Sequence, residues 1–158
     1  MNSGLTLLSV FGIGVVAGLR SLTAPAAVAW AAHLGWIDLH GSALAFMGSK
    51  WTVLIFTVLA LAELVADQLP ATPARTAAVG LSARVVSGGL SGACLAVAGG
   101  VALGFGMVAG AIGGIGGAFG GYHSRVGLVR ALRVPDFVIA ISEDAIAIGL
   151  GLFVVSRF

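Results

Sequence analysis

Residues 76–122 contain a single charged side chain, Arg84, and this shortage of charge limits what the chain can fold into. One membrane-spanning helix needs ~20 apolar residues, so the stretch is long enough for two. Lipid offers no hydrogen-bond partners to the backbone, which favours helices over open strands. The pair Gly99-Gly100 marks a turn inside the stretch. We therefore predict two membrane crossings, joined near these two glycines.

Three other apolar segments, residues 5–34, 51–69 and 135–155, make up most of the remaining chain. Hydrophobic residues account for 59% of the sequence and charged residues for 9%. A soluble domain has about 25% charged residues. The sequence therefore predicts one all-α transmembrane domain over residues 1–158, with about five spanning helices.

The first apolar segment, residues 5–34, is too long for one straight crossing. It contains Arg20 and then Pro25, and proline lacks a backbone donor and clashes with the preceding turn of a regular helix. Thr23 is a suitable cap for a helix that restarts here. We therefore predict a break between Arg20 and Pro25. The free amide groups of a restarted helix can bind an anion or a carboxylate.

The arginines set the predicted orientation. Arg75 follows the second apolar segment, and Arg125, Arg130 and Arg133 are assigned to the loop before the last helix. Basic loops stay in the cytoplasm. With five crossings, the N-terminus is then cytoplasmic and the C-terminus is outside. If the first segment crosses twice or re-enters, which the sequence leaves open, the N-terminus changes side.

Four of the six acidic residues lie in apolar segments, as two pairs. Glu63 and Asp67 belong to the second segment, and Glu143 and Asp144 belong to the last. A carboxylate in hydrocarbon costs at least ~2.5–3.5 kcal/mol on insertion scales, so it faces a bundle interior, a partner charge or a water-filled path. These four residues are therefore candidates for binding an ion or a small polar solute.

Two arginines complete the predicted binding site. Counted from the helix ends, Arg84 lies roughly 10–12 Å into the membrane, at the depth of Glu63 and Glu143. We predict that it lies within ~6 Å of a carboxylate as its counter-ion. Arg20, at the break, is a second binding element. The full set of candidate binding residues is Glu63, Asp67, Arg84, Glu143, Asp144 and Arg20.

Glycine supplies 25 of the 158 residues and is densest in residues 106–121, the predicted fourth spanning helix. Small residues at helical spacing let helix backbones approach closely in lipid. We predict that one glycine face is buried against another helix, within the chain or in a homo-oligomer, with a dimer favoured. The face comprises Gly106, Gly110, Gly113, Gly114, Gly117 and Gly121.

Several function classes lack support in the sequence. Residues 12–17 imitate a dinucleotide fingerprint, but the required strand and the later acidic residue are missing. Cys94 is the only cysteine, so a cysteine-based zinc site cannot form. No basic run is dense enough for nucleic acid. We therefore expect no enzyme activity, no cofactor, no metal site and no nucleic-acid partner, and take the lipid bilayer as the main environment.

Three motifs follow one another along the chain, beginning at Glu63. They are Glu63-x3-Asp67-x2-Pro70-x2-Pro73-x-Arg75, Ala83-Arg84-x2-Ser87-Gly88, and Pro135-Asp136-x6-Glu143-Asp144-x2-Ala147. Together they resemble a family of small bacterial integral membrane proteins catalogued as a domain of unknown function. The resemblance covers most of the chain from Glu63 onward. It implies a polytopic bacterial membrane protein, and it implies no activity and no catalytic residues.

Two functional interpretations remain. In the first, the protein is a small transporter or channel-like protein of a bacterial inner membrane, in which Glu63 and Glu143 bind a cation or proton. In the second, it is a non-transporting membrane scaffold or assembly factor, and the same charges form a static ion-pair network. Transport requires water to reach the carboxylates from at least one side. A scaffold should keep them dry and fully paired.

Overall fold

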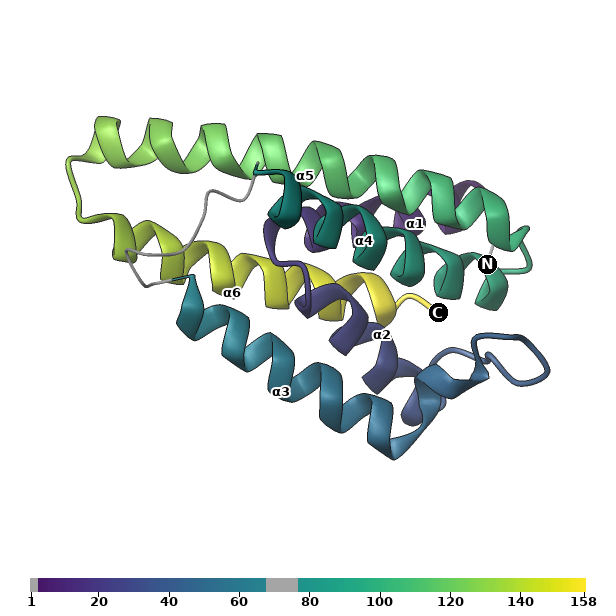
Figure 1. Ribbon diagram of the computed structural model, residues 1–158. Helices are drawn as coiled ribbons and strands as arrows, with labels where there is room; N and C mark the ends of the chain where they lie inside the picture. Colours follow the sequence, from purple (N-terminus) through teal and green to yellow (C-terminus); the bar gives the residue numbers. More distant parts are fainter. Residues whose placement is uncertain (1–2, 68–76) are drawn as a thin grey trace.

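The computed structural model describes residues 3–67 and 77–158, and these residues form six α-helices and one short 3-10 helix (Figure 1). No strand occurs within the described ranges. This confirms the all-α prediction. The helices are α1 (Ser3–Leu19), α2 (Thr23–His33), α3 (Lys50–Ala66), α4 (Ala78–Ala98), α5 (Leu103–Leu132) and α6 (Asp136–Val155), with the 3-10 helix η1 (Ala45–Gly48) before α3.

Three of the helices, α4, α5 and α6, are long and apolar enough to cross a membrane. Their mean hydropathies are 1.4, 1.5 and 2.1. Helix α1 is also apolar but has 17 residues, and α2 has only 11. The turn between α4 and α5 falls at Gly99 and Gly100, as predicted. The total of about five crossings stays a prediction.

Large apolar side chains cover the outside of the bundle, and small residues fill its interior. Val79 is 83% exposed, Leu8 71% and Val86 69%. A water-soluble protein seldom exposes so much apolar surface. The buried positions of α2 are mostly alanine, and those of α4 are mostly glycine, alanine and serine. This distribution is typical of a bundle whose surroundings are lipid.

The first apolar segment is broken at the predicted place. Helix α1 ends at Leu19 and α2 begins at Thr23, which leaves Arg20, Ser21 and Leu22 between them. The N-cap position is held by Leu22 and not by Thr23, and it has no capping side chain of its own.

At this break the chain reverses, and every later helix also runs opposite to the one before it (Figure 1). For α2 and α3 the reversal is clear from two hydrogen bonds, Ser21 to Glu63 and Trp30 to Thr57. The start of α1 and the end of α6 therefore lie at the same end of the bundle. The chain thus reverses within its first apolar segment, which is the alternative that the sequence left open. The side of the membrane on which each terminus lies stays a prediction.

Helix α5 is longer than predicted. It continues through Arg125 and Arg130 to Leu132, so the prediction that these arginines fill a loop is wrong. Its end is set by Arg133, which adopts a left-handed conformation with φ 52°, and by Pro135. Thirty residues span ~45 Å, more than the ~30 Å hydrocarbon core.

The predicted glycine face of α5 is buried at all six positions. Five of its members contact α1 or α4, namely Gly106, Gly110, Gly113, Gly114 and Gly117. A Cβ atom added at Gly114 would lie 2.6 Å from the carbonyl oxygen of Arg84 in α4. One added at Gly18 in α1 would lie 2.5 Å from the Cα of Gly117. The backbones are therefore too close for any side chain. Because this face is used within the chain, the predicted homodimer would need a different surface, and it stays a prediction.

Candidate functional site: charges around the helix break

Glu63 of α3 caps the start of α2. Its carboxylate accepts hydrogen bonds from the backbone N–H groups of Ser21 and Leu22, both at 2.8 Å, and from the Ser21 hydroxyl at 2.6 Å. The first N–H groups of a helix have no partner within the helix, and the helix dipole favours a negative charge there. The anion site predicted at the restarted helix is thus filled by a carboxylate of the protein itself.

Arg84 of α4 performs the opposite role at the end of α1. Its Nε donates to the carbonyl oxygen of Gly18 at 3.0 Å, and its Nη1 donates to that of Gly80 at 2.9 Å. The side chain is buried. The last carbonyl groups of a helix lack partners and carry partial negative charge. Each end of the break therefore meets an opposite charge supplied by another helix.

Arg20 lies between the carboxylates of two helices. Its side chain is 0% exposed, its Nη1 donates to Asp67 Oδ2, and its Nε lies 2.5 Å from Asp144 Oδ1. The Nε–Oδ1 pair is close but is not aligned as a hydrogen bond. Within the described part of the chain, Nη2 of Arg20 makes no hydrogen bond although it is buried. We call Arg20, Glu63, Asp67, Arg84 and Asp144 the break site.

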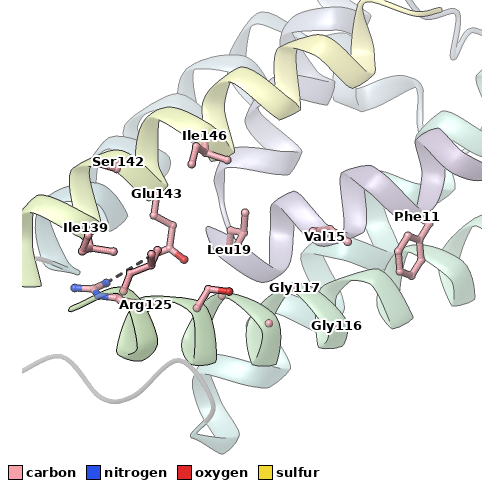
Figure 2. Close-up of a pocket in the computed structure, with 14 residues that line it drawn as sticks. Phe11, Val15, Leu19, Gly116, Gly117, Arg125, Ile139, Ser142, Glu143 and Ile146 are labelled. Carbon is pink, nitrogen blue, oxygen red and sulfur yellow. Dashed lines mark ion pairs between the residues drawn. The ribbon is translucent and has the colours of Figure 1, made fainter. Parts of the chain in front are cut away.

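Glu143 faces away from the break site, towards α5. Its Oε2 lies 3.8 Å from Nη1 of Arg125 (Figure 2). The other nitrogens of Arg125 bind Asp136, with Nε donating to Oδ1 at 2.9 Å and Nη2 donating to Oδ2. Arg125 therefore connects α5 to α6 at two positions.

The structure thus brings five of the six candidate binding residues to the break, while Glu143 pairs elsewhere. The contacts described for Arg84 go to backbone carbonyls, so its predicted pairing with Glu63 or Glu143 stays a prediction. Sequence reasoning missed Arg125 as a partner of carboxylates in the neighbouring helix. The signal was available, because Arg125 and Asp136 flank the proline-marked turn between two helices.

A groove of about 500 Å³ lies beside Glu143, between α1, α5 and α6 (Figure 2). Apolar side chains of α1 and α6 form its walls, among them Phe11, Leu19 and Ile146. Glycines of α5 form its floor, and Arg125 and Glu143 stand at one end. The groove and the break site lie on opposite sides of the Glu143-Asp144 pair.

The fold and the site define a class: an apolar helical bundle with charges at a helix break and three helices compatible with membrane insertion, which suggests a membrane protein. The chain belongs to the family described as "Domain of unknown function (DUF4126)", whose model matches residues 7–156. This confirms the resemblance to a family catalogued as a domain of unknown function. Comparison with curated proteins gave no match, and neither did comparison with solved structures.

Proposed function

We propose that this protein is a small transporter or channel-like protein for an ion or a small polar solute, in a bacterial inner membrane, with the break site as its binding centre. With the arginine-bearing ends of α5 and α6 in the cytoplasm, both chain termini would lie outside. This is the orientation that follows from the reversal at the break.

The observation that carries the proposal is the state of Arg20. A buried donor without an acceptor costs ~1–3 kcal/mol, and more when it is charged. A network that served packing alone would gain stability by giving Nη2 of Arg20 a partner, and within the described residues it has none. A water molecule beside Arg20 would supply the missing acceptor, and transport requires water to reach the neighbouring carboxylates.

Charge and access favour a cation or a proton over an anion. Arg20 contributes one positive charge, and Asp67 and Asp144 contribute two negative charges. The side chains of these aspartates keep 15% and 12% of their surface accessible, whereas Arg20 keeps none. In this arrangement Arg20 is a fixed counter-ion, and the two aspartates are the groups that exchange a partner.

Glu63 has a different role in the proposal. Three donors hold its carboxylate at the start of α2. Releasing it would leave two backbone N–H groups unpaired in the interior. We therefore assign Glu63 to holding the break in place, and not to binding the solute as the sequence suggested.

The alternative function, a membrane scaffold, is supported by the contacts that Glu63 and Arg84 make at the two ends of the break. Glu63 is fully engaged, and Arg84 is buried against backbone carbonyls, so both ends of the break are satisfied within the protein. A scaffold of this kind needs these charges for stability only. Removing them would destabilise the fold without altering any flux.

Reconstitution into liposomes tests the proposal. Flux of protons, Na⁺ and K⁺ would be followed with ion-sensitive dyes, and entry of glycerol and urea by light scattering. We expect wild-type protein to pass at least one of them, and Asp144→Asn to lower that flux about tenfold or more, which is ~1.4 kcal/mol in barrier. Asp38→Asn is the matched control, because Asp38 lies in an exposed loop.

Thermal unfolding in detergent separates the two functions. If the protein is a transporter, Asp144→Asn should lower the flux by a larger factor than it lowers the amount of folded protein. If wild-type liposomes passed none of the five probes, and Asp144→Asn only lowered the unfolding temperature, the transporter would be rejected in favour of the scaffold.

A further inference from the structure

The groove between α1, α5 and α6 is open space that the fold maintains. Gly116 and Gly120 lie on its floor, and a Cβ atom added at either position would meet no atom within 4 Å. These two glycines differ from Gly114 and Gly117, where an added Cβ would collide with a neighbouring backbone. They are therefore not required for helix packing, and their effect is to leave the groove empty of side chains.

The shape of the groove fits a lipid chain. It follows α5 from Gly116 to Leu128, a length of ~18 Å at 1.5 Å per residue. Its direction is that of the helix axes, which is also the direction of acyl chains in a bilayer. Its volume of about 500 Å³ lies within the ~300–1,000 Å³ typical of ligand sites. Its walls include Phe11, Val15 and Ile139, which are apolar.

One end of the groove is polar and basic. Arg125 lines it there, opposite Ser142 and Glu143 of α6 (Figure 2). Beyond this end, α5 and the following turn carry Arg130 and Arg133, both exposed. With Asp136 and Glu143 included, this end has three positive and two negative charges. Basic positions at the cytoplasmic ends of membrane helices attract anionic lipid headgroups.

We infer that the groove binds one anionic phospholipid of the host bilayer, with an acyl chain over Gly116 and Gly120 and the phosphate at the Arg125 end. This inference does not depend on transport. It assigns a function to the space between α5 and α6, which the break site does not use.

Filling the groove with a side chain tests whether the acyl chain of the lipid lies there. Gly116→Leu and Gly120→Leu each place a side chain in the groove without a backbone clash, and leucine favours a helix more than glycine does. The control is Gly104→Leu, because Gly104 is on the same helix, is exposed, meets no atom within 4 Å of an added Cβ and lies outside the groove. Phosphatidylglycerol adducts would be counted by native mass spectrometry of the detergent-solubilised protein. We expect one retained lipid on wild type and Gly104→Leu, and none on either groove variant.

The headgroup end is tested with a second matched pair. Arg125→Gln and Asp136→Asn break the same contact, but only the first removes the positive charge. We expect wild type and Asp136→Asn to prefer phosphatidylglycerol over phosphatidylcholine, and Arg125→Gln to lose this preference. Unfolding temperatures measured without added lipid show whether each variant is folded.

Three results would overturn the inference. The first is unchanged lipid retention in folded Gly116→Leu and Gly120→Leu. The second is a phosphatidylglycerol preference that survives Arg125→Gln. The third is a dimer that becomes a monomer in the groove variants while lipid binding stays constant, which would mean that a second copy of the chain occupies the groove.

Discussion

At the scale of single residues, the most consequential side chain is Arg20. It is fully buried and contacts carboxylates of α3 and α6, so it joins the break to two other helices. Guanidinium is planar and can engage two carboxylates at once, which a lysine ammonium cannot reproduce in the same geometry. A positive charge alone is therefore not sufficient to hold both carboxylates at this position.

Arg20→Ala should destabilise the protein by ~3–5 kcal/mol, because Asp144 would be left as an uncompensated buried charge and Asp67 would lose its partner. Arg20→Lys should cost less than Arg20→Ala. Arg130→Ala, at an exposed position, should be close to neutral. Equilibrium or thermal unfolding in detergent measures all three. An Arg20→Ala variant as stable as wild type would mean that the ion pairs contribute nothing to the fold.

Glu63 allows a test of the capping interaction. Glu63→Gln keeps an acceptor oxygen but loses the negative charge, and we expect a loss of ~1 kcal/mol from the helix dipole and the charge-assisted hydrogen bonds. Glu63→Ala removes the acceptor for three donors and should cost more. Amide hydrogen exchange at Ser21 and Leu22 provides the local readout. Equal exchange in wild type and Glu63→Ala would contradict the capping role.

At the scale of helices, the contact of α5 with α1 and α4 depends on missing side chains. Gly114→Leu should force α5 away from α4, since its Cβ would lie 2.6 Å from the carbonyl oxygen of Arg84. Gly117→Leu should do the same against α1. We expect both variants to aggregate or to unfold at lower temperature in size-exclusion and melting experiments. Gly149→Leu, where an added Cβ meets nothing within 4 Å, is the control. Normal stability of both variants would disprove close packing.

The sequence predicts which segments are helical and where they break, because these depend on local composition, on Pro25 and on helical glycine spacing. It does not predict that the chain reverses at the break. Proline ends a helix without setting the exit angle, and here Glu63 and Arg84, both distant in sequence, hold the two ends. For the same reason the sequence identified the embedded carboxylates but did not predict that Arg20 joins Asp67 and Asp144.

At the scale of the whole molecule, the alternating helix directions predict that both chain termini lie on the same side of the membrane. Cysteines introduced at Ser3 and Ser156, both exposed, should react with a membrane-impermeant maleimide from the same side of the membrane. A cysteine at Arg130 should react from the other side. The native Cys94 is buried and should give little background. Labelling of Ser3→Cys and Ser156→Cys from opposite sides would contradict the reversal at the break.

The way the break is satisfied also bears on how the chain is made. When α1 and α2 leave the ribosome, the Gly18 carbonyl and the amides of Ser21 and Leu22 have no partners, because Glu63 and Arg84 are synthesised later. Arg20 likewise lacks one of its partners until Asp144, near the end of the chain, has been synthesised. The first two helices therefore depend on the insertion machinery until α3, α4 and α6 arrive. A chain truncated before α4 should remain a substrate for membrane proteases.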